Sequence, residues 1–348
     1  MAVIQPKFQK TDALTLAEQI KFFDPSGAPA QIGEILNETN EILQDVTFKE
    51  GNLPTGDEQT VRTGLPTVYW RQMNRGVPSS HSTVASVTET CSEMSATSQI
   101  DESVCNLNGN GAAFRKNEER PFIESMGQKL AHTLIYGDTA LGGFSGFATR
   151  YSTVDKTKAE NAKNVIDCGG TGSGLTSIYI VGWGDNVYCP YPKGSAVGLR
   201  VLDGGLSDAF DDQGNRYKAY VTTYKWQVGL MVRDWRYVVR LANINVNDLM
   251  TGTGVGSGDI KTAGTTNILL KIQEALTKIP SGQKSNLAIY CNSDVFAGLN
   301  VVSQRVNSNV ITFETGANAY GGRTSWASFE GVPLRQVDQI TNKEKQVK

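Results

Sequence analysis

Apolar residues recur at helical spacing over residues 117–138. Four of them follow one another at steps of four positions: Phe122, Met126, Leu130 and Leu134. This spacing places all four on one face of a helix, so we predict a long spine helix with a buried apolar side. Pro121 suits the first turn of that helix, and Gly137 suits its end.

Similar spacing predicts four shorter helices. Two lie near the N-terminus, at 13–23 and 32–46, and two lie in the C-terminal third, at 266–280 and 293–306. Pro280 ends the third of these helices, and the Ser-Asp pair that opens the fourth predicts a capped N-terminus. The two N-terminal helices are too short to form a core of their own, so we expect them to lie on another surface.

Residues 48–110 have a different pattern, which is rich in Ser, Thr, Gly and Val. Alternation of apolar and polar positions predicts two strands, over 59–74 and 82–101, joined by the turn-rich segment 75–81. The segment holds few large apolar residues for its length, and a two-stranded ribbon is only marginally stable by itself. We therefore expect a long arm that needs a partner surface.

The rest of the chain is mainly β in pattern. Strands are predicted at 176–183, 216–232, 287–292, 311–315 and 326–340. Together with the helices, these strands predict an α+β fold.

The stretch 225–246, "KWQVGLMVRDWRYVVRLANINV", combines aromatic rings with arginines, as nucleic-acid platforms do. Its apolar residues alternate in two phases: Trp226, Val228, Leu230 and Val232, then Trp235, Tyr237, Val239 and Leu241. The phase breaks at Arg233-Asp234, and the arginines are not in register with the rings. Alternation favours a structural strand system. A nucleic-acid surface stays open as the alternative.

Length and charge limit the classes of protein to consider. A chain of 348 residues suggests about two domain-sized units. The net charge is −2, whereas nucleic-acid-binding proteins usually carry a basic excess, so any positive patch must be local. No stretch approaches the ~20 apolar residues of a membrane helix, and the N-terminus lacks the apolar core of a secretory signal. The five scattered cysteines predict free thiols in a reducing compartment.

Residues suited to catalysis or metal binding are sparse. The glycine-rich stretches 169–174 and 251–258 lack the Lys-Ser/Thr of a phosphate loop, so they predict flexible turns. The two histidines, His81 and His132, are far apart in the sequence, which argues against a histidine metal site or triad. The aspartates of 208–215 lack the closing Glu of a calcium loop and predict a hairpin turn. We expect no catalytic, cofactor-binding or metal-binding residues, and no enzymatic activity.

Several long blocks of the sequence are unusual enough to indicate a family. They are "GNLPTGDEQTVRTGLPTVYWRQMNRGV", "NGNGAAFRKNEERPF", "TSIYIVGWGDN", "YPKGSAVGL" and "RDWRYVVRLANI". Together they resemble the major capsid protein of short-tailed bacteriophages related to epsilon fifteen. The closing "FEGVPLRQVDQI" resembles the last strand that Hong Kong 97-type capsid proteins return to their peripheral domain.

This resemblance implies a Hong Kong 97-like α+β capsid fold. The implied parts are an N-terminal arm (1–46), an extended loop (47–110), a peripheral domain (111–262) with the spine helix 117–138, an axial domain (263–325) and a return strand (326–348). The extended loop is then expected to protrude and to bury most of its surface on other chains.

The resemblance also implies the function. A capsid protein of this kind self-assembles, as hexamers and pentamers, into the icosahedral shell that encloses the double-stranded DNA genome of a tailed phage. The implied partners are scaffolding, portal and decoration or cement proteins, with only non-specific contact to the packaged DNA and no membrane. The implied location is the virion capsid, assembled in the cytoplasm of the bacterial host.

Two groups of residues are candidates for roles in the shell. The candidates for subunit packing are Trp226, Arg233, Asp234, Trp235, Arg236 and Arg240. We expect the two tryptophans to be buried anchors and the arginines to reach acidic groups of the same or an adjacent subunit. The spine-helix core is expected to consist of Phe122, Met126, Leu130 and Leu134, facing the subunit's own sheet.

Overall fold

The computed structural model describes most of the chain from residue 40 onward. The described residues are 40–106, 111–211, 213–251, 255–256, 259–260, 268–280, 286–306, 311–317 and 323–348. The helix predicted at 13–23, and that at 32–46 up to residue 39, lie outside them. The described residues divide into two compact units: the first lies within 93–129 and 198–227, and the second lies within 40–92, 130–197 and 228–348.

A mixed sheet forms the core of the second unit. In order across the sheet, its strands are β15 (Ile311–Ala317), β16 (Arg323–Phe329), β17 (Val332–Gln336), β14 (Leu287–Cys291), β6 (Leu175–Gly182), β11 (Val238–Asn245) and β5 (Val165–Asp167). Every residue of β6 and β14 is buried, as expected for strands that are covered on both faces. β6 pairs antiparallel with both β11 and β14, whereas β14 pairs parallel with β17.

Helices pack on this sheet. Helix α7 (Ile268–Lys278) contacts β11 and buries one apolar face, as its spacing predicts. Helix α8 (Ser293–Val306) contacts the short helix α6 (Val246–Thr251). The N-terminus of α8 is capped by Asn292, whose side-chain oxygen accepts a hydrogen bond from the Val295 N–H at 2.8 Å. The predicted Ser-Asp cap is therefore wrong by one residue, because the capping residue precedes the first helical one.

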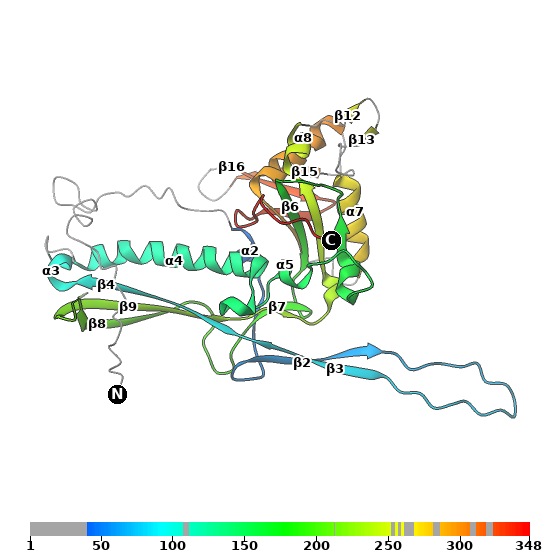
Figure 1. The fold of residues 1–348 in the computed structure, drawn as a ribbon, viewed down its shortest axis with the longest axis horizontal. Helices are drawn as coiled ribbons and strands as arrows, with labels where there is room; N and C mark the ends of the chain where they lie inside the picture. Colours follow the sequence, from blue (N-terminus) through cyan, green and yellow to red (C-terminus); the bar gives the residue numbers. More distant parts are fainter. Residues whose placement is uncertain are drawn as a thin grey trace, which may run out of the picture. The chain divides into compact units, whose positions relative to one another are not determined.

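The predicted ribbon exists but is shorter than expected. Strand β2 (Gly56–Gly64) pairs antiparallel with β3 (Thr83–Thr90), and the ribbon projects from the rest of the second unit (Figure 1). A side chain at Gly56 would come within 2.0 Å of the Glu89 carbonyl oxygen, so glycine lets the two strands approach there. At its base lies a small sheet of β1 (Phe48–Glu50), β7 (Val187–Tyr191) and β10 (Met231–Val232).

The second strand of the predicted ribbon divides at Cys91. Strand β3 stays in the ribbon, whereas β4 (Ser92–Asp101) joins a different sheet, so the strand predicted over 82–101 is wrong. At the break, the Cys91 N–H donates to the Thr55 carbonyl at 2.9 Å, and its Sγ contacts the Pro190 carbonyl. The alternation of residue types continues through Cys91, which is why the sequence pattern does not reveal the break.

The first unit contains a three-stranded sheet in the order β4, β9 (Arg216–Val228) and β8 (Arg200–Phe210). The hairpin turn predicted from the aspartates of 208–215 connects β8 to β9. The short helix α3 (Glu102–Cys105) follows β4.

The spine helix, α4, runs from Gly111 to Tyr136, so it begins six residues earlier than predicted. Pro121 lies inside the helix and not in its first turn. A proline inside a helix costs about 3 kcal/mol, because it lacks an N–H and crowds the preceding turn. The part of α4 that precedes Pro121 is stabilised by the burial of Phe114 against Ile100 and Cys105, a contact that the spacing of apolar residues does not show.

The stretch 225–246 is not one strand system but four pieces. Strand β9 ends at Val228, β10 covers only two residues, a 3₁₀ turn spans Trp235–Tyr237, and β11 begins at Val238. Asp234 starts the 3₁₀ turn, since its carboxylate accepts the Arg236 N–H at 3.0 Å. Similarly, the strand predicted at 326–340 is a hairpin of β16 and β17 whose two turn residues have positive φ.

Candidate subunit-packing surfaces and the buried Arg240 network

The tip of the ribbon exposes large apolar side chains. Trp70 and Met73 are almost completely exposed, at 102% and 96%, and Leu65 and Val68 are nearly as open. They lie in the segment 65–82 that connects β2 to β3 (Figure 1). Exposed apolar groups clustered in one segment are typical of a binding surface, because each would gain by leaving water.

An ion pair fastens the base of the ribbon. Arg150 forms a two-pronged salt bridge with Glu89 on β3, at 2.6 Å and 2.8 Å. The same guanidinium donates to the carbonyls of Leu230 and Ser145 at 3.1 Å and 3.0 Å. Both side chains are largely buried, and this fork geometry is the strong form of an arginine–carboxylate pair.

A second carboxylate lies opposite Glu89 on the other strand. Asp57 pairs with Glu89 in the ribbon register and is buried, at 2% exposure. It accepts a hydrogen bond from the Tyr188 hydroxyl and another from the Asn52 N–H. Burial, together with the Asp57 carboxylate, raises the pKa of Tyr188, so the phenol remains a donor. Each carboxylate at the base of the ribbon thus has its own donors.

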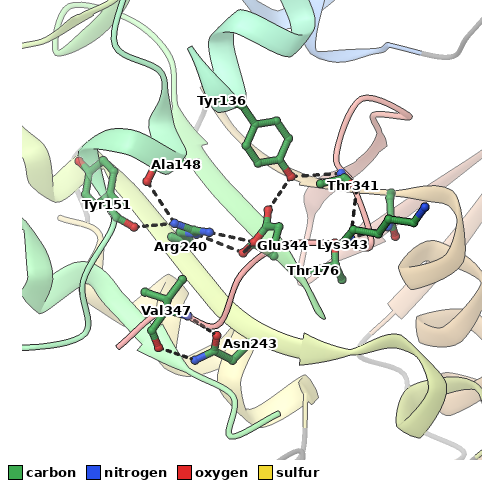
Figure 2. Close-up of polar contacts among 12 residues, drawn as sticks. Tyr136, Ala148, Tyr151, Thr176, Arg240, Asn243, Thr341, Lys343, Glu344 and Val347 are labelled. Carbon is green, nitrogen blue, oxygen red and sulfur yellow. Dashed lines mark hydrogen bonds and ion pairs between the residues drawn. The ribbon is translucent and has the colours of Figure 1, made fainter. Parts of the chain in front are cut away.

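The most deeply buried salt bridge among the described residues joins Arg240 on β11 to Glu344 in the C-terminal segment. The Arg240 Nη2 lies 2.8 Å from the Glu344 Oε2, and each side chain is only 5% exposed. Figure 2 shows Arg240 directed at Glu344, with the carbonyls of Ala148 and Tyr151 on its other side. Those two carbonyls accept from Nη1 at 3.2 Å and 2.8 Å.

Glu344 gathers donors from three elements. Its carboxylate accepts from the Tyr136 hydroxyl of α4 and the Ser177 hydroxyl of β6, as well as from Arg240. Burial, and then the charge of Glu344, raises the pKa of Tyr136, so its hydroxyl keeps its proton. The backbone N–H of Glu344 also donates to the Leu175 carbonyl at 3.0 Å.

Further hydrogen bonds hold the residues that follow Glu344. The Asn243 side chain exchanges two bonds with the backbone of Val347, at 2.9 Å and 2.8 Å (Figure 2). The Thr153 hydroxyl donates to the Lys348 carbonyl at 2.8 Å. Sequence reasoning missed this C-terminal network. The only local signal was one acidic residue, Glu344, between the lysines of the closing segment.

The residues predicted for subunit packing lie in different environments. Arg240 is buried inside its own subunit, so its predicted place on a packing surface is wrong, although it does reach an acidic group of the same chain. Arg236 pairs with Asp234 at 2.7 Å and is exposed. Arg233 is exposed and forms no salt bridge with any described residue.

Both predicted tryptophan anchors are only half-buried. Trp226 lies on β9, and Trp235 lies in the 3₁₀ turn. The single subunit therefore leaves part of each ring exposed, Trp226 within β9 and Trp235 where the strand pattern gives way to the 3₁₀ turn, and their role as buried anchors between subunits stays a prediction. Of the predicted spine-helix core, Met126, Leu130 and Leu134 are buried, and Phe122 stacks on Tyr224 with ring centroids 5.1 Å apart.

The chain matches known capsid proteins. The family model described as "Major capsid protein GP7" matches residues 24–348. The chain is similar to a chain in the near-atomic-resolution structure of bacteriophage Epsilon15, with a TM-score of 0.74 and 26% identity over 100% of this chain and 99% of that one. It is also similar in fold to the capsid of bacteriophage JBD30, with a TM-score of 0.51 and 11% identity over 89% of this chain and 94% of that one. No curated protein matches the chain.

The mixed α/β fold and its projecting ribbon are therefore those of a shell-forming capsid protein with the Hong Kong 97-type fold. The chain belongs to the major capsid protein GP7 family. The predicted family resemblance, fold class and capsid function are confirmed, and nothing supports the alternative of a nucleic-acid-binding module built on 225–246. Within the described part of the chain, no helix is long and apolar enough to cross a membrane.

Proposed function

We propose that this chain assembles as hexamers and pentamers into the icosahedral shell of a tailed bacteriophage, and that the ribbon tip of each subunit lies on a neighbouring subunit. The single observation that carries this proposal is the projecting ribbon with an exposed apolar tip. A ribbon of two strands cannot bury such side chains by itself. A neighbouring subunit supplies the surface that the ribbon lacks.

Energetics support contact between subunits. Fully burying a large apolar side chain contributes about 1.5–3 kcal/mol, and the tip presents several of them. The exposed tip residues include Leu65, Val68, Tyr69, Trp70 and Met73. Aromatic and methionine side chains are enriched at protein interfaces, whereas an exposed ring of this size is uncommon on a monomer. Repeated at every subunit, this contact would close a shell.

The ion pair at the ribbon base supports the same role. The salt bridge between Arg150 and Glu89 joins strand β3 to the rest of the second unit, so it restricts the orientation of the ribbon. The capsid role is geometric and non-enzymatic. By analogy with shell-forming phages, the proposed partners are scaffolding, portal and decoration proteins, and the proposed place of assembly is the host cytoplasm. The peripheral and axial domain boundaries remain predictions.

Electron microscopy of the purified chain tests this proposal. We expect closed shells from the wild-type chain and only small oligomers from a Trp70→Ser/Met73→Ser variant. Leu141→Ser is the matched control, because Leu141 is 88% exposed but lies outside the ribbon. If the ribbon variant closes shells as efficiently as the control, the ribbon does not carry the subunit contact. If the wild-type chain forms no shell under any assembly condition, the proposed function itself is refuted.

A further inference from the structure

Three segments of the second unit concentrate the positive charge of the chain. They are the loop 152–164, helix α7 and the C-terminal segment 341–348, which we call together the lysine surface. They hold eight lysines and four acidic residues, and so carry a net charge of +4. The whole chain has a net charge of −2, so all other residues together carry −6. One of the four acidic residues, Glu344, is buried against Arg240 and does not offset the exposed lysines.

The three segments lie next to one another. The Lys348 carbonyl accepts hydrogen bonds from the Thr153 hydroxyl at 2.8 Å and from the Val154 N–H at 3.3 Å. The Lys278 ammonium donates to the Lys163 carbonyl at 2.7 Å. The C-terminal segment is thus joined to the start of the loop, and α7 is joined to its end.

Most of these ammonium groups form no salt bridge with a described residue. Three lysines of the loop and α7 form salt bridges with acidic residues three positions away. Among the residues that the structure describes, the other five form no salt bridge: Lys156, Lys278, Lys343, Lys345 and Lys348. Burial lowers the pKa of Lys278; the Glu274 carboxylate opposes this shift, and the nearby positive charges of Lys156 and Lys271 add to it. The surface therefore has an excess of positive charge that its own carboxylates do not neutralise.

The lysine surface is also hollowed. An open hollow of about 410 Å³ is lined by Lys343 and Lys345, and by hydroxyl residues that include Thr149, Ser152 and Thr341. Its lining also includes Glu344, whose charge is paired with that of Arg240. Lysine ammonium and Ser/Thr hydroxyl groups are the side chains that proteins use to contact phosphate oxygens. Lysine is depleted at the centres of protein–protein interfaces, which instead use aromatic residues and arginine. The chemistry of the hollow fits a phosphate better than another protein.

We propose that the lysine surface binds the phosphate backbone of double-stranded DNA, without reading its sequence. This inference rests on the proposed function, because it names the surface through which a shell subunit contacts the packaged genome. Four exposed lysines that form no salt bridge with a described residue, Lys156, Lys343, Lys345 and Lys348, provide a few phosphate contacts per subunit. Contacts that are weak in each subunit and repeated over many copies hold DNA against a shell without fixing its position.

The test compares two full-length variants with the same change in net charge. Lys156→Gln/Lys343→Gln/Lys345→Gln removes three exposed, unpaired lysines of the lysine surface. Lys116→Gln/Lys193→Gln/Lys218→Gln removes three exposed lysines from elsewhere in the chain. Binding of unassembled subunits to a mixed-sequence duplex is measured from about 50 to about 200 mM salt. Each lost phosphate contact lowers the slope of log affinity against log salt by about 0.9, so the first variant should lower it by about 2 to 3.

The control variant should keep most of the wild-type slope. An equal decrease of the salt slope in both variants would show that only total charge matters, and would overturn the inference. A wild-type chain that does not bind the duplex would overturn it as well. Binding of poly-glutamate as tightly as the duplex would also overturn it, in favour of an acidic protein partner. Electron microscopy of the same proteins under assembly conditions separates this result from the proposed function: shells that form normally, with no selective loss of DNA binding by the lysine-surface variant, refute the lysine surface alone.

Discussion

Replacing Glu344 with alanine should strongly destabilise the unassembled subunit. The substitution leaves Arg240 as a buried cation without its carboxylate, while its other donors still point at Ser177 and two backbone carbonyls. Breaking a buried ion pair by removing one partner costs about 3–5 kcal/mol, because an uncompensated charge stays buried. Folded domains are stable by only about 5–15 kcal/mol, so this loss would remove a large part of the total.

Two further variants separate charge from packing. Glu344→Gln keeps the shape of the side chain and an oxygen for the Tyr136 hydroxyl, but it removes the negative charge, so we expect a smaller loss than for alanine. Arg240→Met/Glu344→Leu removes both charges, and replacing a whole buried pair with apolar residues is often neutral or stabilising. The double variant should therefore be more stable than Glu344→Ala alone.

Urea unfolding of unassembled subunits, followed by circular dichroism, measures these differences. Lys345→Ala is the matched control, since Lys345 is exposed and one position away, and surface substitutions usually change stability by less than about 0.5 kcal/mol. A loss of less than about 1 kcal/mol for Glu344→Ala would refute the reasoning, because such a value is typical of an exposed ion pair.

Three other outcomes are expected. Leu130→Ala should cost about 2–5 kcal/mol in urea unfolding, since Leu130 is fully buried on α4; an unchanged midpoint would contradict that burial. Arg233→Gln/Arg236→Gln should impair shell assembly, seen by electron microscopy, while duplex DNA affinity stays as in the wild type; a steep fall in DNA affinity would restore the nucleic-acid interpretation. Burial raises the pKa of Cys91 to about 11 and that of Cys168 to about 12, from 9.0. Above about pH 9 the unfolded chain loses these protons while the folded chain keeps them, so the stabilisation should be fully present below about pH 9 and be lost between about pH 9 and 12; an unfolding midpoint that is constant over this window would contradict it.

Elements whose signal is local could be predicted from the sequence. Helix α7 and strand β14 were predicted at nearly their observed bounds, because their periodicity and their end signals lie within the same few residues. The hairpin turn between β8 and β9 was also correct for this reason. The ribbon was predicted from its composition, since a segment without large buried side chains cannot form a core.

Contacts between distant parts of the chain decided the rest. Phe114 holds the part of α4 that precedes Pro121, because it packs on residues that come before the helix. Cys91 ends the ribbon because its amide bonds to the Thr55 carbonyl and its thiol to the Pro190 carbonyl on β7. The buried pair joins Arg240 to a residue 104 positions away. A lone glutamate among lysines looks like a solvated residue in sequence, since its burial depends on which strands meet around it. The lysine surface follows from the same fold, because only the path of the C-terminal segment brings its lysines beside those of the loop and α7.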